Sequence, residues 1–443
     1  MNGVQEPAPP PSVSAVVPIW GEEQVLPRLL PSLRATLEAL DLDAEIIVTA
    51  WRPRVDLRNL VEDEKATLVE ARGGGYGDVL RAGLGAARGA WVITMDADTP
   101  HLADFIPAMW AHRDEADVLI GSRYLRSSVA QMPLERRILS RALNLLYRTS
   151  LSLPFRDLSS GFRMYGRRVL QDIDPPAAHG LDILPEILVK AICQGWRVTE
   201  VPFWYRGGRP WTRARMLRFG RGYVETLGSL FSLRNSVRAA DYDHRAFDSW
   251  IPLQRYWQRR RFEIIRNFAA PLSGGRLLDT GCGSSRIVQT IPGVIGMDLA
   301  LRKLRWLRGP GRHLLQGDMN HLPFRSGTFD TVICSEVIEH IPREDVRLEE
   351  LVRVIQPGGL LVLGTPDYSR RRWLMLEWLY GKVFPNGYVK EHINRYTREG
   401  LRRELMELGL QILAERYVGG SEIIFAARVP TDPRGSAAAE PAA

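Results

Sequence analysis

The sequence predicts an α/β protein of two domains, each built on its own mostly parallel sheet. Short apolar, β-branched runs alternate with segments of helical periodicity, and this alternation occurs twice, from residue 13 onward and again after Pro271. Such alternation is typical of parallel sheets that helices cover on both faces. The 443 residues also exceed what a single hydrophobic core usually supports. We therefore expect one domain over residues 13–235 and a second over residues 266–430.

Strand-like runs give the order of the expected elements. In the first domain, helices are expected over 22–40, 78–87 and 102–112, between strands at 13–18, 45–49, 67–69, 91–95 and 117–121. In the second domain the strands are expected at 276–279, 294–298, 329–334 and 360–364. The runs 410–417 and 422–428 have no clear helical pattern between them, which predicts a terminal hairpin.

The segment between the domains is rich in arginine. Apolar residues recur at helical spacing from Met216, and a second basic helix is expected over residues 254–265. We therefore interpret residues 236–265 as a basic helical linker. Its arginines form either a solvated face between the domains or an amphipathic surface that meets anionic lipid headgroups. No zinc, helix-turn-helix or RNP-like pattern accompanies them, so no nucleic-acid partner is expected.

Bulk properties indicate a globular protein of a reducing compartment. The net charge is +8, and three cysteines occur without paired spacing, which favours neither a disulfide framework nor a zinc site. The sequence shows no signal peptide and no apolar run of roughly 18 residues. We expect a cytoplasmic protein whose membrane contact, if any, is peripheral at the inner face of the membrane. The Pro- and Ala-rich ends, 1–12 and 431–443, are expected to be disordered.

Two carboxylates, Asp96 and Asp98, follow the apolar run 91–95. The end of a strand in a parallel sheet presents its side chains at an open edge. Carboxylate oxygens are ligands for hard divalent cations, and such a cation neutralises a diphosphate leaving group. The pair therefore predicts a site for Mg²⁺ or Mn²⁺ and a nucleotide sugar. A solvated strand end is the alternative that this pair alone leaves open.

Four further segments occur in a fixed order around this pair: 18–23, 73–77, 121–124 and 157–163. Together these motifs resemble family 2 glycosyltransferases of GT-A fold, most of all the polyprenyl/dolichyl-phosphate mannose synthase branch. The resemblance covers residues 13–235 and implies a Rossmann-like nucleotide-diphospho-sugar transferase domain. It implies that Glu22 lies at the nucleotide pocket and that Asp96 and Asp98 bind metal and diphosphate, with Asp98 catalytic.

The same resemblance implies an acceptor site for a polyprenyl phosphate or a glycolipid. Arg123, with Arg136 and Ser140 on the next helix, would grip the acceptor phosphate, since a guanidinium fork suits a phosphate oxyanion. Asp157 would line the acceptor side and assist as a base. A structural ion pair between Asp157 and Arg163 is the alternative interpretation.

Two positions depart from the family pattern. Residues 49–53 replace the acidic motif that usually follows the second strand, so the carboxylate that reads base and ribose is missing. Pro100 stands where a third metal ligand is often found, and His101 is a substitute ligand or a surface residue. These departures leave the sugar donor open.

A glycine-rich turn follows the first strand of the second domain. Gly281 and Gly283 let the chain pass close to a ligand, and Asp279 precedes them. Asp298 closes the next strand, where it can bind ribose hydroxyls, and Asp318 follows the third, where it can meet the adenine amino group. These residues resemble class I S-adenosylmethionine (SAM)-dependent methyltransferases of type 11, which implies a second Rossmann-like domain with SAM as cofactor.

Glu336, Glu339 and His340 follow the fourth strand of this domain at spacings that can converge. Some related O-methyltransferases bind a divalent metal with such an element and a downstream histidine, here His392. The alternative is that Glu339 and His340 orient a loop and that one of them acts as a catalytic base.

The sequence therefore predicts a bifunctional transferase. One domain would transfer a sugar to a polyprenyl-phosphate or related acceptor, and the other would methylate, on oxygen, a product of the same glycan or glycolipid pathway. The alternative is a SAM-dependent methyltransferase whose degenerate glycosyltransferase domain only binds sugar nucleotide or lipid phosphate. A purely non-enzymatic scaffold fits poorly with two cofactor loops.

Overall fold

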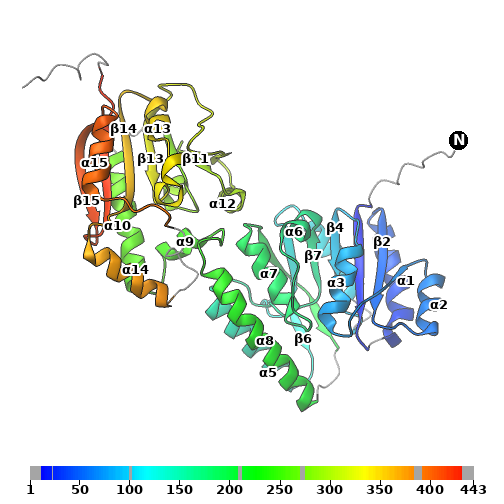
Figure 1. The fold of residues 1–443 in the computed structure, drawn as a ribbon. Helices are drawn as coiled ribbons and strands as arrows, with labels where there is room; N and C mark the ends of the chain where they lie inside the picture. The colour runs from blue at the N-terminus through cyan, green and yellow to red at the C-terminus, as the bar shows by residue number, and fades with distance from the viewer. Residues whose placement is uncertain are drawn as a thin grey trace, which may run out of the picture. The chain divides into compact units, whose positions relative to one another are not determined.

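The computed structural model describes residues 11–21, 23–98, 102–207, 212–269, 275–383 and 392–431. The chain divides into two compact units, Met1–Phe231 and Ser232–Ala443 (Figure 1). Most of the two segments that were expected to be disordered, 1–12 and 431–443, lies outside the described residues. No helix in the described part of the chain is long and apolar enough to cross a bilayer.

The first unit contains a seven-stranded sheet in the order β3-β2-β1-β4-β7-β5-β8. All pairings are parallel except those of β7, which is antiparallel to both β4 and β5. A separate two-stranded sheet joins β6 to β9. The strands are β1 (Val13–Ile19), β2 (Ala44–Ala50), β3 (Thr67–Glu70), β4 (Trp91–Thr94), β5 (Val118–Ser122), β6 (Val129–Gln131), β7 (Arg163–Gly166), β8 (Val198–Pro202) and β9 (Trp204–Arg206).

Helices cover both faces of this sheet. Val13, Ala15 and Val17 of β1 pack in one core with α1, while Val16 packs in the other beside α3. A central strand that is buried on both faces reads as a continuous apolar run, as residues 13–19 do. The helices are α1 (Leu26–Ala39), α2 (Val55–Asp63), α3 (Tyr76–Ala86), α4 (Ile106–Ala111), α5 (Leu134–Ser150), α6 (Arg167–Asp172), α7 (Ile183–Cys193) and α8 (Arg213–Arg234).

The second unit contains a seven-stranded sheet in the order β12-β11-β10-β13-β14-β16-β15. β15 and β16 pair antiparallel with each other and β16 pairs antiparallel with β14, which confirms the expected terminal hairpin. The strands are β10 (Leu277–Thr280), β11 (Ile295–Asp298), β12 (His313–Gln316), β13 (Phe329–Ser335), β14 (Ile355–Pro366), β15 (Gln411–Val418) and β16 (Glu422–Arg428).

Two cores flank this second sheet as well. One core packs its strands with α13 and α15, and the other packs them with α10, α11 and α12. The helices are α9 (Tyr242–Phe247), α10 (Pro252–Ala269), α11 (Arg286–Thr290), α12 (Leu301–Leu307), α13 (Leu348–Val354), α14 (Arg371–Val383) and α15 (Arg398–Glu407). The prediction of two α/β domains is therefore confirmed.

The arginine-rich segment requires a correction. Residues 236–265 were interpreted as a linker, but they form α9 and most of α10 within the second unit. Ile264 and Ile265 of α10 are buried in the core under β10 and β13. Their burial ties the helix to the sheet, whereas the basic side chains on its other face gave the sequence the appearance of a solvated connector.

Arg163 is one of the largest fully buried side chains of the first unit. Its guanidinium donates to the carbonyl oxygens of Ser160, Leu184 and Leu158 at 2.8, 2.6 and 2.6 Å, and to the Tyr165 hydroxyl at 3.2 Å. These bonds hold the turn before β7 against the start of α7. Burying a cation is costly unless its donors are satisfied, and here four bonds do so.

We expect Arg163→Met to lower the free energy of unfolding of the first unit by about 3 kcal/mol or more, because the buried carbonyls of Leu158 and Ser160 lose their donor at roughly 1–3 kcal/mol each. Arg168→Met, at an exposed neighbouring position, should change that free energy by less than about 0.5 kcal/mol. Hydrogen exchange of the most protected amides in β1 and β4 measures both variants. Equal effects of the two substitutions would contradict the assignment.

Candidate active sites

Asp96 lies two residues after the end of β4 and contacts Gly161 in the turn that precedes β7. The Tyr76 hydroxyl donates to Asp96 Oδ1 at 2.7 Å. A Cβ on Gly161 would come within 2.5 Å of both Asp96 oxygens, so only glycine permits this approach. Burial, and next the charge of Asp98, raise the pKa of Asp96 to about 6. Two carboxylates in one low-dielectric site repel each other, and a cation would relieve that repulsion.

Asp98 has partners from two other elements. Its Oδ2 accepts a hydrogen bond from the Tyr205 hydroxyl of β9, and the Arg136 guanidinium of α5 lies 3.4 Å away. Burial, and next the charge of Asp98, raise the pKa of Tyr205, so its hydroxyl stays protonated and donates. Arg123 and Arg136 each approach the Tyr205 ring at 5.7 Å. Tyr205 was not among the residues expected from the sequence, because no motif marks a three-residue strand.

Arg123 and Asp157 form a buried pair rather than two separate acceptor groups. The Arg123 guanidinium donates to both Asp157 oxygens at 2.7 Å, and its backbone N–H donates to Oδ2 at 2.9 Å. Burial would raise the pKa of Asp157, but the charge and hydrogen bonds of Arg123 outweigh it and lower the pKa. A carboxylate held in this way is a poor base.

Two predictions about this pair are therefore corrected. Asp157 was expected to assist as a base, yet its oxygens are occupied by Arg123. The ion-pair partner suggested as the alternative was Arg163, which instead binds backbone carbonyls. Arg123 itself, expected to grip a phosphate, is only 7% exposed and also donates to the Ser159 hydroxyl at 2.8 Å.

Arg136 and Ser140 lie on one face of α5, as the sequence predicts. Ser140 Oγ accepts from the Tyr124 hydroxyl at 2.8 Å and lies 2.9 Å from Ser159 Oγ. Asn144, one turn further, binds the backbone N–H of Leu158 at 3.1 Å. This inner face of α5 therefore joins Asp98 to the turn that contains Asp157.

The expected nucleotide side is only partly described. Glu22, Pro100 and His101 lie outside the described residues. Trp51, which stands in the segment that replaces the acidic motif, packs on the glycine-rich turn, since a Cβ on Gly74 would come within 2.6 Å of its ring. The Trp20 indole donates to Gly74 O at 2.9 Å. Trp20 and Trp51 therefore contact this turn, and Trp51 stands in the segment where the family pattern has an acidic residue.

In the second unit, a cavity of about 390 Å³ opens beside the turn after β10. Gly281 and Gly283 both have positive φ, 66° and 53°, which glycine adopts without strain. A Cβ on Gly281 would come within 2.3 Å of the Val337 side chain. The predicted residues Asp279, Gly281, Gly283, Asp298, Glu336 and His340 all line this cavity.

The acidic residues of the cavity differ in environment. Asp298 accepts from the backbone N–H groups of Gly283 and Ala300, each at 2.8 Å. Asp279 is 4% exposed, and burial raises its pKa to about 7. Asp318 lies on the turn after β12 with a half-exposed side chain, and its Oδ1 accepts from Asn320 N at 2.9 Å. Its predicted contact with adenine stays a prediction.

A second cluster at this cavity was not expected from the sequence. Asp243 of α9 accepts from the Ser284 backbone N–H and hydroxyl, each at 3.1 Å, and from the Lys303 ammonium at 3.0 Å. Burial would raise the pKa of Asp243, but Lys303 and Ser284 outweigh it and lower the pKa to about 2. Asp243 lies outside every recognisable motif, since α9 precedes the first strand of the unit.

Glu336 was expected near the possible metal ligands but pairs with Arg261 of α10 at 3.1 Å. Arg261 also donates to both oxygens of Glu422, at 2.6 and 2.7 Å. Glu336 has a positive φ of 60°, and burial raises its pKa well above its usual range. The structure therefore separates Glu336 from the other three residues of the predicted set.

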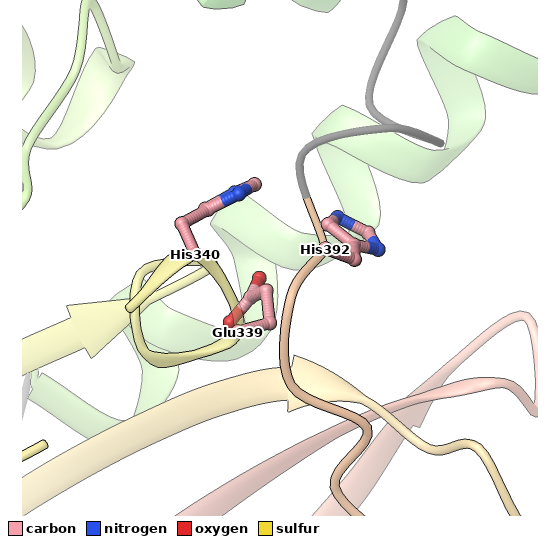
Figure 2. A group of neighbouring side chains, drawn as sticks. All are labelled: Glu339, His340 and His392. Atoms are coloured by element: carbon pink, nitrogen blue, oxygen red, sulfur yellow. The ribbon is translucent and has the colours of Figure 1, made fainter. Parts of the chain in front are cut away.

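Glu339, His340 and His392 do converge (Figure 2). One ligand atom from each lies within 4.8 Å of the others. Glu339 is fully buried, and burial raises its pKa. Burial, and next the charge of His340, lower the pKa of His392 to about 3, so that its imidazole is neutral near pH 7. A neutral imidazole can donate a lone pair to a metal.

Two family models match the chain. Residues 14–174 match the Glycosyl transferase family 2 model, and residues 278–363 match a Methyltransferase domain model. The chain therefore carries a family 2 glycosyltransferase domain followed by a class I methyltransferase domain. The two matches fall in the two structural units.

Curated relatives match only part of the chain. A tRNA (carboxymethyluridine(34)-5-O)-methyltransferase from Arabidopsis thaliana is 31% identical over 150 residues, which are 32% of this chain and 36% of that protein. A ubiquinone biosynthesis O-methyltransferase from Paracidovorax citrulli is 28% identical over 144 residues, 29% of this chain and 58% of that protein. The chain thus spans less than two thirds of the length of these relatives.

Among solved structures, glucosyl-3-phosphoglycerate synthase from Mycobacterium tuberculosis, in complex with uridine diphosphate, is 18% identical with a TM-score of 0.41. The match covers 50% of this chain and 80% of that one. A SAM-dependent methyltransferase from Thermotoga maritima is 19% identical with a TM-score of 0.30, covering 39% of this chain and 94% of that one.

We expect the affinity of the chain for SAM to rise about tenfold between about pH 6 and about pH 8, because ionised Asp279, with its pKa of about 7, attracts the positive ammonium and sulfonium of SAM. Below its pKa the carboxyl is neutral and this attraction is lost. Isothermal titration calorimetry across that range measures it. Asp279→Asn should flatten the profile, whereas Asp318→Asn should keep its slope. A profile with equal slope in wild type and Asp279→Asn would refute this cause.

Proposed function

We propose that the first unit transfers a sugar from a nucleotide sugar to a polyprenyl phosphate or a related lipid phosphate. We propose that the second unit transfers a methyl group from SAM to an oxygen of a glycan or glycolipid in the same pathway. One observation carries the choice of acceptor: α5 presents polar groups to Asp98 on one face and apolar groups to solvent on the other.

The donor side rests on Asp96 and Asp98. Both carboxylates stand just after β4, and the pKa of Asp96, raised to about 6 by partial burial and then by the charge of Asp98, indicates an acidic pair that a cation would stabilise. The donor set of two carboxylates fits Mg²⁺ or Mn²⁺, which would neutralise the leaving diphosphate. Tyr205 and Arg136 orient Asp98 through its Oδ2. Glu22 would complete the nucleotide side, as the family resemblance implies.

The acceptor side rests on α5. Arg136 lies beside Asp98, and Ser140 follows one turn later, so that the two groups can bind a phosphate next to the donor diphosphate. Arg123 does not bind the phosphate itself in this proposal. Its pairing with Asp157 fixes the position of the neighbouring turn, and its guanidinium lies near the Tyr205 ring. A phosphate acceptor is already anionic, and the transfer therefore needs no base from Asp157.

The outer face of α5 suits a lipid surface. Leu134, Ile138 and Leu145 share this face by helical spacing and are 56%, 59% and 60% exposed. Arg141 and Arg148 flank them and are exposed. An apolar stripe with arginines at its margins is typical of helices that lie in the interface of an anionic membrane.

α8 packs against the buried face of α5 and also carries exposed apolar side chains. The Tyr147 hydroxyl of α5 donates to the Tyr223 carbonyl of α8 at 2.6 Å, and the two rings pack edge to face. Leu217 and Val224, seven residues apart on one face of α8, are also exposed. The two helices together would hold the polyprenyl chain in the bilayer while its phosphate reaches Arg136 across the width of α5.

The methyltransferase proposal rests on the cavity after β10. Its glycine turn and the carboxylates Asp279 and Asp298 suit a nucleoside with a positively charged methionine end. His340 and Glu336 line the same cavity, which places the acceptor-side element next to the cofactor. Methyl transfer is an in-line displacement that mainly requires this positioning.

The main alternative is that the first unit binds sugar nucleotide or lipid phosphate without turnover. Two observations favour it: Trp51 stands in the segment that lacks the family acid, and Asp98 already contacts Tyr205 and Arg136. The alternative predicts binding that depends on these residues but no release of nucleotide.

We expect release of nucleotide diphosphate from a panel of nucleotide sugars, with polyprenyl phosphate and Mn²⁺ present. Asp98→Asn should lower this rate by at least about 100-fold, because a lost metal ligand forfeits several kcal/mol of charge stabilisation. Asp114→Asn, an exposed aspartate of the same unit, is the matched control. Release that is absent with every donor, or that does not depend on Asp98, would favour the binding-module alternative.

We expect the chain to sediment with vesicles that contain anionic lipid at low salt. Ile138→Glu should weaken binding at least about tenfold, because the apolar contact of about 1.5 kcal/mol or more is replaced by a like charge. Val55→Glu on α2, also highly exposed, should bind as wild type. Equal sedimentation of both variants would remove the α5 face from the membrane contact.

A further inference from the structure

We propose that Glu339, His340 and His392 bind a divalent transition-metal ion of the Mn²⁺, Fe²⁺, Co²⁺ or Zn²⁺ class, with an open position for an oxygen ligand from the methyl acceptor. The proposal of a metal site does not depend on the proposed methyl transfer. The proposal that the open position binds an oxygen of the methyl acceptor does depend on it. Glu336 is not part of this site, because Arg261 holds it.

The backbone fixes the two ligand-bearing segments against each other. The N–H groups of Ile393 and Asn394, which directly follow His392, donate to the Glu339 carbonyl at 2.8 and 3.0 Å. The Asn394 side chain also donates to the Ile341 carbonyl. The three ligands are therefore brought together by a local scaffold that does not depend on a metal, which lowers the cost of binding one.

The hydrogen bonds of His392 select its ligand atom. The Tyr368 hydroxyl donates its proton to Glu377 Oε1 at 2.7 Å, so its oxygen accepts from His392 Nδ1 at 2.9 Å. The proton of His392 therefore sits on Nδ1, and the lone pair sits on Nε2. Trp373 stacks on the imidazole at 6.0 Å between ring centroids. Metal-binding histidines are commonly oriented by such a partner on the other nitrogen.

The carboxylate of Glu339 independently indicates that a cation belongs at this site. Its side chain is fully buried, and Oε2 accepts from the Thr365 hydroxyl at 3.1 Å. Oε1 is buried and has no hydrogen-bond partner among the described residues. A buried carboxylate oxygen without a donor is costly, and a cation at the centre of the three residues would satisfy it.

The donor set decides the class of ion. Two imidazoles and one carboxylate suit Zn²⁺, Fe²⁺, Co²⁺ or Mn²⁺, whereas Mg²⁺ prefers oxygen ligands and retains its waters. Three protein ligands leave at least one position open, as in catalytic rather than structural sites. His340 also lines the cofactor cavity, so that the open position would lie on the side where an acceptor meets SAM.

The test uses the full chain with Asp98→Asn, which removes the predicted metal site of the first unit. After chelator treatment we expect Co²⁺ to bind at about one equivalent per chain, with visible absorption bands of a nitrogen-ligated ion, and an excess of Mg²⁺ not to displace it. In this background His340→Ala and His392→Gln should lose the bands. Glu336→Gln, the matched control, should keep them.

Tyr368→Phe tests the orientation of His392 without removing a ligand. We expect Co²⁺ affinity to fall by about 10–100-fold, because Nδ1 loses its hydrogen bond to the Tyr368 oxygen at 2.9 Å, while Glu377 Oε1 lies further away at 3.4 Å. Thermal denaturation in the presence and absence of Co²⁺ separates loss of the site from loss of the fold, since a folded variant without the site melts at the same temperature in both.

The proposal is overturned if the Asp98→Asn chain binds no Co²⁺, if folded His340→Ala and His392→Gln both bind it as the parent does, or if Glu336→Gln abolishes binding. SAM binding by calorimetry is measured on the same samples. Retained SAM binding without Co²⁺ binding refutes the metal site alone, whereas absent SAM binding refutes the proposed methyl transfer.

Discussion

The carboxyl edge of each parallel sheet is the constraint on which both candidate sites depend. A strand buried on both faces carries mostly apolar side chains along its length, so charged groups concentrate towards its ends. In the first unit this places Asp96 and Asp98 after β4. In the second unit Asp298 closes β11 and the glycine turn follows β10. Parallel neighbours end at the same edge, and residues far apart in the chain therefore meet there.

Buried charges at these edges are balanced by cations from elements outside the motifs. Arg123 binds Asp157, Lys303 binds Asp243, and one guanidinium, that of Arg261, serves both Glu336 and Glu422. Breaking such a pair leaves an uncompensated charge, which costs far more than a surface pair contributes. Arginine suits this role because its fork holds two carboxylate oxygens at once and its charge persists under burial. Part of the arginine content that looked like an exposed basic face is therefore internal.

Features that depend on the local sequence pattern could be predicted, whereas side-chain contacts that depend on tertiary packing could not. The strands expected from apolar runs are present, and the positions of Asp96, Asp98, Asp279 and Asp298 followed from the ends of those runs, whereas β6, β7, β8 and β9 and the order of strands within each sheet were not predicted. The pairing of Arg123 with Asp157 did not follow, because any arginine near the site fits the phosphate interpretation equally well. The contact of Tyr205 with Asp98 could not be predicted for a related reason. Tyr205 lies on a three-residue strand, β9, whose position is set by its pairing with β6. Glu336 was misassigned because helical spacing cannot show that Arg261 approaches it from α10.

α9 and α10 illustrate how far a functional unit can extend beyond its motifs. Asp243 and Phe247 of α9, and Arg261 and Ile265 of α10, line the cofactor cavity, although both helices precede the first strand of the unit. The cavity is thus closed on one side by residues that no glycine-turn pattern includes. Because Ile264 and Ile265 are also part of the hydrophobic core, removing this segment would expose apolar surface and unpair Lys303 and Glu422 together. The methyltransferase unit therefore begins near residue 232 in physical terms, well before the first residue that its family pattern recognises.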